Sequence, residues 1–476
     1  MKKSGIDLTQ GNLLKNLLKL SLPIMFSNFL QTFYNLTDAF WLGKLGDKAR
    51  DAVSVAGLAF PLIFFLSSFG FGFVIAGTSL ISQYKGAGNI DQVRQVVGQF
   101  IILIVLFSIV FITGSLIFLD KILLLLRTPA EIFTLANEFI TVILIGMVFM
   151  FIFMSYQSFS HGLGDTVSPM KIQIISVGLN VILDPVFIFG IGFFPRLETY
   201  GAAIATLIAR IAAAILAIYF MFKKLPELVP QKNNIIPDSE MLKKIIKVGI
   251  PASVSHSITS FGFLILQGFV NTFGTLVIST FSIGNRIISF FMMPAMGISS
   301  ALSTVIGQNL GAKKVERAVK SVKVSFGLVL TIMITGNIFM LLFSSSLIRF
   351  FINDPEVIKI GTRMIRVTSF AATIFAVLFV FIGVFNGSGH TKSAMIFNIS
   401  RLWFFRIPLV YILSGYILNI TPFNSSFFYK MLYPLSVPLA QYPYDALWWS
   451  MLISNILSSF WAFMVYRKGN WKKGMI

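Results

Sequence analysis

Long apolar runs recur from one end of the chain to the other and are separated by shorter polar connections. Twelve of them have about 20 or more residues, enough for an α-helix to cross a hydrocarbon layer of ~30 Å. The runs are continuous and are not alternating segments of ~10 residues, so they predict a helical bundle and not a β-barrel. The predicted spans are Leu17–Leu42, Val53–Tyr84, Val97–Leu119, Phe133–Ser160, Met170–Gly192, Gly201–Met221, Ile245–Phe273, Ile278–Leu310, Val319–Ser344, Ile360–Phe385, Ala394–Ile417 and Ala446–Tyr466.

The composition agrees with an all-α membrane protein. Of 476 residues, 56% are hydrophobic and 12% are charged, whereas soluble domains carry roughly 25% charged residues. Cysteine is absent, which excludes disulfides and thiolate metal sites. No phosphate-binding loop of the G-x-x-x-x-G-K-[ST] type occurs, so we expect neither ATP hydrolysis nor another enzymatic activity, and no cofactor.

A net charge of +20 would suit nucleic acid, but the placement of the charge argues against that partner. In the predicted topology, 24 of the 38 Lys and Arg residues lie at the end that holds both termini, and 10 lie at the opposite end. Such an asymmetry is typical of the positive-inside rule, and it predicts a cell-membrane protein with both termini in the cytoplasm. The basic excess then serves topology and contact with anionic lipid.

The sequence is duplicated. Four pairs of segments match at offsets of 225 to 228: Gly162–Met170 with Gly387–Met395, Gln83–Gly86 with Gln308–Gly311, Thr128–Pro129 with Asp354–Pro355, and Leu20–Pro23 with Val248–Pro251. We therefore predict a six-helix lobe at 1–225, a cytoplasmic linker at 226–240 and a second six-helix lobe at 241–476. Parallel repeats of this kind are typical of transporters that work by alternating access.

Two acids, Asp38 and Asp184, lie deep within predicted spans. A carboxylate at the centre of a spanning helix costs about 2.5–3.5 kcal/mol on insertion scales, so such a residue is a functional candidate. Glu138 is the nearest further case, about two turns into its span. If the two carboxylates lie close together, they cannot both stay ionised without a cation. The pair predicts a site that holds either a proton or a metal cation.

Several motifs of the first half resemble the multidrug and toxic compound extrusion (MATE) family, in particular its DinF-like prokaryotic branch. They are Gln31–Asp38, Gln83–Gly88, Gly162–Thr166, Asn180–Pro185 and Gly201–Thr206. The resemblance implies twelve helices in two lobes that form a V, and export of organic cations in exchange for H⁺ or Na⁺. We expect such a protein to act as a monomer. Other branches carry an essential acid in the seventh helix, which here has none, so the resemblance implies that coupling resides in the first lobe.

The candidate residues fall into two groups. Gln31, Tyr34, Asn35 and Asp38 share one helical face, Asn180 and Asp184 are one turn apart, and Pro185 removes the N–H that would bond the Val181 carbonyl. We predict cation coupling by Asp38, Asp184, Asn180, Asn35 and Thr206, with Asp38, Asp184 and Asn180 as the Na⁺ ligands if sodium is the ion. We predict substrate contacts by Gln31, Tyr34 and Gln157.

Other interpretations remain open from sequence alone. Asp184 could pair with Arg210, Asp38 could be a solvated residue of the outer rim, and the amides and Thr206 could serve helix packing. The alternative function is a lipid-linked oligosaccharide flippase, which would need basic residues such as Arg210, Arg286, Arg366 or Arg406 facing the cleft. The long connection at 418–445 could cover the outer mouth or be a plain surface loop.

Overall fold

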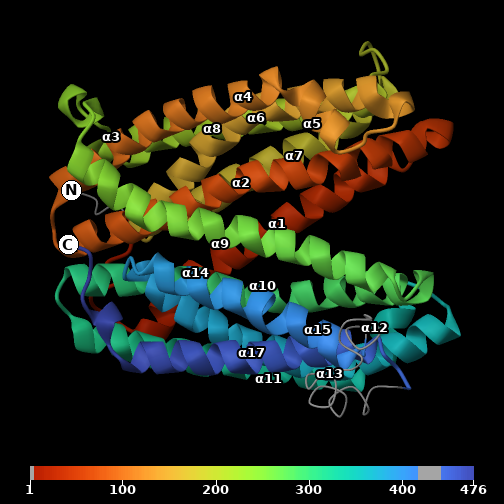
Figure 1. Cartoon of the computed structure of the whole chain (residues 1–476). Coiled ribbons are helices and arrows are strands. Elements are labelled where there is room, and N and C mark those ends of the chain that lie inside the picture. Colours follow the sequence, from red (N-terminus) through yellow and green to blue (C-terminus); the bar gives the residue numbers. More distant parts are fainter. Residues whose placement is uncertain (1–4, 416–440) are drawn as a thin grey trace.

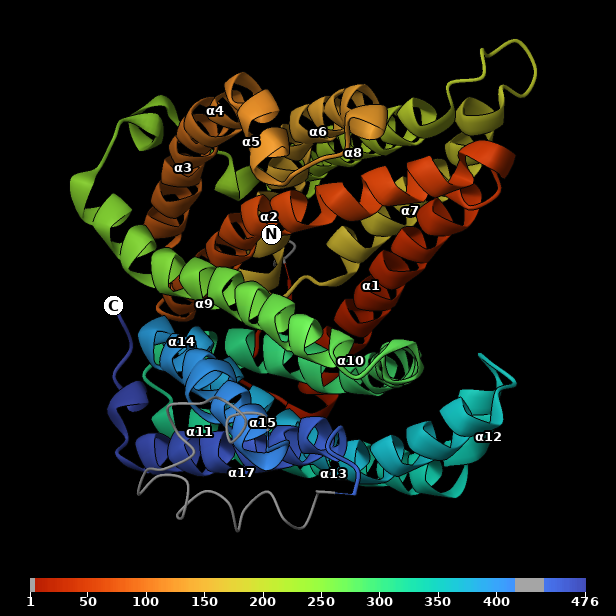
Figure 2. The ribbon, with the colours of Figure 1, turned by 45° about the vertical axis from the view of Figure 1, so that its right-hand side comes forward.

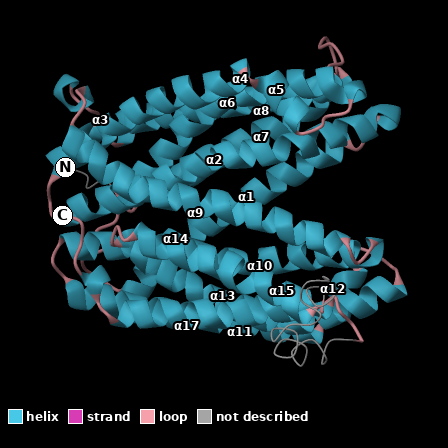
Figure 3. Cartoon of the chain, in the orientation of Figure 1, coloured by secondary structure: helices cyan, strands magenta, loops and turns pink. Residues whose placement is uncertain are grey.

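The computed structural model describes residues 5–415 and 441–476. These residues form helices joined by loops and turns, and none of them is in a strand (Figure 3). The predicted mouth loop lies mostly at 416–440, outside these ranges. Twelve long helical segments correspond to the predicted spans: α1 (Leu13–Leu42), α2 (Ala49–Gly86), α3 (Ile90–Phe107) continued by α4 (Thr113–Ile117), α6 (Ala130–Gly162), α7 (Val167–Phe189), α8 (Glu198–Lys224), α9 (Ser239–Asn271), α10 (Thr275–Gly311), α11 (Val315–Leu342), α13 (Pro355–Gly387), α14 (Thr391–Ile399) continued by α15 (Ile407–Leu413), and α17 (Asp445–Arg467).

The helices differ from the predicted spans mainly at their ends. Most begin or end a few residues further out, because capped polar turns extend each helix beyond its apolar run. Asn12 caps α1 and Asp238 caps α9 through side-chain acceptors. Two short helices, α5 (Leu119–Leu125) and α12 (Ser344–Arg349), follow the third and ninth spans.

Eleven segments are long and apolar enough to cross a membrane by composition alone, and α1 is the exception. This helix has 30 residues, about 45 Å at 1.5 Å per residue, so its length suffices to span. Its outer half carries Asn28, Gln31, Thr32, Asn35 and Asp38 and is therefore less apolar. This less apolar helix holds two of the five predicted cation-coupling residues, Asn35 and Asp38.

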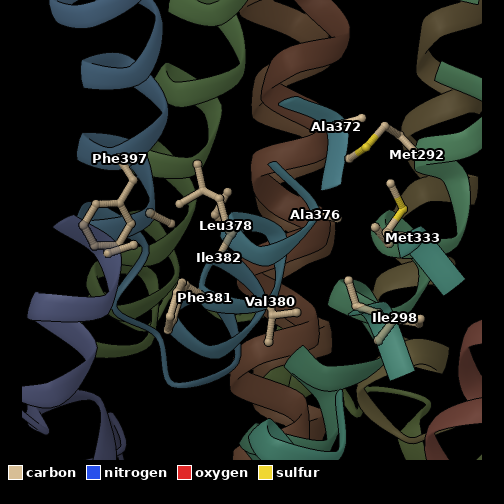
Figure 4. Close-up of a cluster of buried hydrophobic side chains, with 14 of the residues drawn as sticks. Met292, Ile298, Met333, Ala372, Ala376, Leu378, Val380, Phe381, Ile382 and Phe397 are labelled. Carbon is tan, nitrogen blue, oxygen red and sulfur yellow. The ribbon is translucent and has the colours of Figure 1, made fainter. Parts of the chain in front are cut away.

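The helices form two lobes, α1–α8 and α9–α17, which meet near the chain termini and diverge toward the other end (Figures 1 and 2). Across the junction, Gly72 of α2 packs on Ser253 of α9, and Gly297 of α10 packs on Met25 of α1. The predicted twelve-helix, V-shaped bundle is confirmed. One apolar cluster lies within the first lobe, while the large cluster of the second lobe, to which Met292, Met333, Phe381 and Phe397 belong (Figure 4), also takes in the first half of α1.

The lobes are joined at the terminal end by two related glutamines, which the sequence repeat pairs at an offset of 225. Gln83 of α2 donates from Nε2 to the Gly387 carbonyl at 3.0 Å, and Gln308 of α10 donates from Nε2 to the Gly162 carbonyl at 3.0 Å. Each glutamine thus bonds the last residue of the fourth helix in the opposite lobe. Both side chains are buried. We call this pair of contacts the glutamine bracket.

Each glutamine of the bracket also holds one end of the chain. The Oε1 atom of Gln308 accepts from the Leu8 N–H at 3.2 Å, and that of Gln83 accepts from the Met475 N–H at 2.8 Å. The backbones approach so closely that a Cβ on Gly86 or Gly311 would clash with the carbonyl of the opposite glutamine. Segments near both ends of the chain, at Leu8 and Met475, therefore take part in the contact between the lobes.

The connection between the lobes contains short regular structure. Between α8 and α9 lie two short 3₁₀ turns, Pro226–Leu228 and Lys232–Ile235. Gln99 of α3 donates from Nε2 to the Asn234 and Ile236 carbonyls, each at 2.8 Å. These bonds fasten the connection to the first lobe.

We predict that Gln83→Leu and Gln308→Leu each lower the free energy of unfolding by roughly 1–3 kcal/mol, because each leaves buried backbone groups without partners. The measurement is denaturation of the purified protein in detergent. Gln267→Leu is the control, since Gln267 bonds only Asn271 on its own helix face. Equal stability of all three variants would contradict a bonding role for the bracket.

Candidate functional site

Three helices of the first lobe, α1, α7 and α8, bring most of the predicted cation-site residues together. Asp38 lies on α1 one turn from the helix end, about 6 Å along the axis, and Asp184 lies on α7 about 8 Å from its end. Asp184 is closer to its helix end than its predicted span implied, because Gly190 terminates α7 in a left-handed conformation. The two acids therefore lie at similar depth.

Asp184 and Asn180 are fully buried and face each other along α7. The Asn180 Nδ2 donates to Asp184 Oδ1 at 3.1 Å. Asp38 is half-buried and lies close enough to Asp184, Asn180 and Tyr34 to interact with all three electrostatically. This is not the geometry of a solvated residue on the outer rim.

Three oxygen atoms in this cluster are buried and have no hydrogen-bond donor among the described residues: Asp38 Oδ1, Asn180 Oδ1 and Asp184 Oδ2. Buried acceptors without partners are uncommon and costly, by about 1–3 kcal/mol each. Pro185 lies in the same stretch of α7 and leaves the Val181 carbonyl without its usual N–H partner. Oxygen atoms of this kind are suitable ligands for a proton or a hard cation.

The cluster is closed toward α8 by a hydrogen bond between the Tyr34 hydroxyl and the Thr206 hydroxyl, 2.8 Å apart. Thr206 is buried, and Tyr34 is partly buried. Tyr34, predicted as a substrate contact, therefore lies beside the carboxylates. The bond ties α1 to α8 across more than 170 positions of sequence.

Arg210 is the fixed positive charge of this region. It does not form an ion pair with Asp184; its Nη1 donates instead to the Ile143 carbonyl of α6 at 3.2 Å. Its charge acts on Asp38 and Tyr34, so it lies within reach of the cluster without direct contact to a carboxylate. From sequence, Arg210 was a candidate ion-pair partner of Asp184 or a cleft-facing arginine of a flippase.

The remaining predicted residues lie outside this cluster. Asn35 is exposed and forms no hydrogen bond with the described residues, and exposed Gln31 accepts a bond from Gln173 of α7 at 3.0 Å. Gly146 of α6 lies against Arg210. Gln157 follows Gly146 by eleven residues, which is three helical turns plus about 20°, so the two residues lie on nearly the same face of α6. Gln157 therefore points into the first lobe, roughly 16 Å along α6 from the level of Arg210. Helical spacing alone could not say which neighbour each face meets.

A twofold bundle of spanning helices with a buried carboxylate pair in one lobe has the architecture of a membrane transporter. The family model described as MatE matches residues 23–186 and 251–412, one segment in each lobe. The chain therefore belongs to the MatE family, as its motifs predicted.

Curated relatives cover most of the chain. The probable multidrug resistance protein YpnP of Bacillus subtilis (strain 168) is 28% identical over 412 residues, which cover 86% of this chain and 91% of that protein. The probable multidrug resistance protein NorM of Thermotoga maritima is 29% identical over 406 residues, 84% and 86% of the two chains. A solved structure described as the outward-facing conformation of a multidrug resistance MATE family transporter of the MOP superfamily has a TM-score of 0.85 at 23% identity, with 98% of each chain covered.

A double-mutant cycle tests the placement of Arg210. We expect a coupling free energy of roughly 0.5–1 kcal/mol between Arg210→Gln and Asp38→Asn, because their charges interact. Between Arg210→Gln and Asp184→Asn we expect less than about 0.5 kcal/mol, because no ion pair joins them. Unfolding in detergent supplies the four free energies of each cycle. Stronger coupling to Asp184 than to Asp38 would contradict the described geometry.

Proposed function

We propose that this protein is a secondary antiporter that exports cationic amphiphilic compounds and takes up H⁺ or Na⁺ in exchange. The observation that carries the proposal is the set of buried acceptor oxygens of Asp38, Asn180 and Asp184 without donors. The names of the relatives support small organic molecules as the substrates. The basic residues near the termini support a cytoplasmic location for both termini in the cell membrane.

The local charges favour exchange of one monovalent cation. Two carboxylates and the nearby Arg210 carry a net charge of −1 when all three are ionised. A single H⁺ or Na⁺ restores neutrality, and the low dielectric of the lobe interior makes neutrality strongly favourable. We infer that release of this cation and binding of a cationic substrate compete for the same negative charge. No cofactor is required, and a single copy of the chain contains the complete site.

The alternative, a flippase for lipid-linked oligosaccharides, is supported by one residue. Arg286 of α10 is exposed and lies eleven residues from Gly297, so it is on nearly the same face that packs on α1. Arg210 and Arg406 are instead occupied inside their lobes, by the Ile143 carbonyl and by Ser454 and Asn455. A pyrophosphate needs several convergent donors, so drug export is the better supported function.

We predict that Asp38→Asn and Asp184→Asn each reduce gradient-driven export by about tenfold or more while the protein still folds, because an amide cannot exchange a cation. Asn180→Ala should reduce it less, since water can replace an amide ligand. The assay measures uptake of a fluorescent lipophilic cation by proteoliposomes under separately imposed pH and Na⁺ gradients. Glu138→Gln is the control, because Glu138 is an exposed acid within the predicted span of α6 and lies outside the cluster. Full transport by both aspartate variants would refute the coupling mechanism.

We also predict that the two ends of the cleft between the lobes open alternately, with the glutamine bracket closed in one state and open in the other. Spin labels at Asp47 and Gly274, in the connections at the diverging end, should show two distance populations whose ratio responds to pH or Na⁺. In Asp184→Asn the ratio should no longer respond, because the cation cannot act on the equilibrium. One invariant distance under every gradient would exclude alternating access in this form.

A further inference from the structure

Arg406 is a buried charge in the second lobe, and the coupling site does not involve it. It ends a π-helical segment, Ser400–Arg406, between α14 and α15, and only 3% of its surface is exposed. Its Nε donates to Ser454 Oγ at 3.2 Å, and its Nη2 donates to Asn455 Oδ1 at 3.0 Å. Both partners are neutral side chains of α17. The guanidinium Nη1 has no acceptor among the described residues.

No carboxylate among the described side chains balances this charge. The acid at the start of α17, Asp445, is paired with Arg363 and accepts a further bond from Trp448 Nε1. A second arginine, Arg401, is also buried, lies over the Phe375 ring and repels Arg406. A buried cation without a counter-charge is costly, by several kcal/mol per ion. Neither buried arginine has a carboxylate partner among the described side chains, so this part of the lobe carries uncompensated positive charge.

A small cavity adjoins Arg406. Its volume is about 20 Å³, and it lies between α9, α10, α15 and α17. A cavity of 10–15 Å³ on this measure holds about one water molecule, so the space suits one small particle. Besides Arg406, the polar side chains lining it are Asn285 and Ser450. The Asn285 amide has no hydrogen bond with the described residues, and the Ser450 hydroxyl, which donates to the Leu447 carbonyl at 2.9 Å, can rotate.

The sequence repeat places this cavity at the position in the second lobe that corresponds to the cation site in the first lobe. The offset that aligns Pro23 with Pro251 aligns Asp38 with Leu266, which lines the cavity. The π-helical segment of the second lobe accommodates one extra residue. The offset between corresponding residues of the two lobes therefore rises from 225 before this segment to 226 at its end. Asp184 then corresponds to Val410, another lining residue, and Asn180 corresponds to Arg406. The second lobe thus has a counterpart of the cation site in which the carboxylates are apolar and an amide is a guanidinium.

We propose that this cavity binds a small monovalent anion, with chloride as the representative ligand, held by Arg406, Asn285 and Ser450. The guanidinium supplies the charge, while the amide and hydroxyl supply two further donors. The volume of about 20 Å³ favours a small anion over sulfate or an organic carboxylate. Its apolar lining disfavours a hydrated divalent anion. The bound anion supplies a negative charge beside Arg406 and stabilises the fold of the second lobe.

The experiment measures thermal unfolding of the purified full chain in detergent with Na⁺ held constant and the anion changed among chloride, bromide, gluconate and sulfate. Chloride and bromide should raise the unfolding midpoint, by about 2 °C for each tenfold increase above the dissociation constant. Gluconate and sulfate should not. Isothermal titration with sodium bromide should give one site per chain.

Three variants locate the site. Arg406→Gln should abolish the halide response, while Asn285→Leu and Ser450→Ala should weaken the apparent affinity by about tenfold each through loss of a donor. The control Arg366→Gln removes an exposed arginine of the same lobe and should keep the full response. If Arg406→Gln does not fold, the other two variants still decide the question.

The proposal is overturned if the wild-type midpoint is the same in all four anions. An undiminished response in Asn285→Leu and Ser450→Ala also overturns it, since the anion would then lie outside the cavity. Because the readout is unfolding and not transport, the result does not depend on the proposed antiport.

Discussion

The arrangement of the two lobes depends on the need to satisfy buried polar groups at their junction. Gln83 and Gln308 each use both the donor and the acceptor of the side-chain amide. The Nε2 donates to a glycine carbonyl of the opposite lobe, and the Oε1 accepts from a segment near one end of the chain. In a buried junction no water replaces a lost partner, so the two bonds on each side form or break together. Such a contact has two states, closed or open, and resists intermediate ones.

The closed bracket has a consequence for the cation site. It fixes the lobes at the terminal end, and they diverge at the other end, where Asp38 and Asp184 lie within about 6–8 Å of their helix ends (Figure 1). A cation that leaves the cluster therefore has a shorter path to the open end than to the closed end. Tyr34 links the two regions, because it bonds Thr206 and belongs to α1, which also packs on α10. Occupancy of the cluster can thus bias the lobe arrangement through one helix.

Much of this architecture could be predicted from the sequence, because its causes are local. Spanning length and apolar composition define the helices, and matching motifs define the repeat. Asp38 and Asp184 could be found because a carboxylate within a span is costly without a use. Asn35 and Gln157 were harder to place, because the spacing within one helix does not reveal what its faces meet. The partner of Arg210 is a backbone carbonyl, which carries no sequence signal. The partners of the bracket glutamines are also backbone groups, so the bracket could not be predicted, although both glutamines belong to a motif that repeats in the sequence.

The two lobes share one backbone plan but differ in charge at corresponding positions: the first lobe carries two acids and the second carries one arginine. Asp38 and Asp184 have the apolar counterparts Leu266 and Val410, and Asn180 has the counterpart Arg406. In the proposed mechanism, a cation would therefore be attracted to the first lobe and repelled from the corresponding position in the second. If both lobes held carboxylate pairs, two cations could bind independently, and neither site alone would determine the exchange. Because the carboxylate pair lies in the first lobe alone, the proposed exchange would depend on a single cation site.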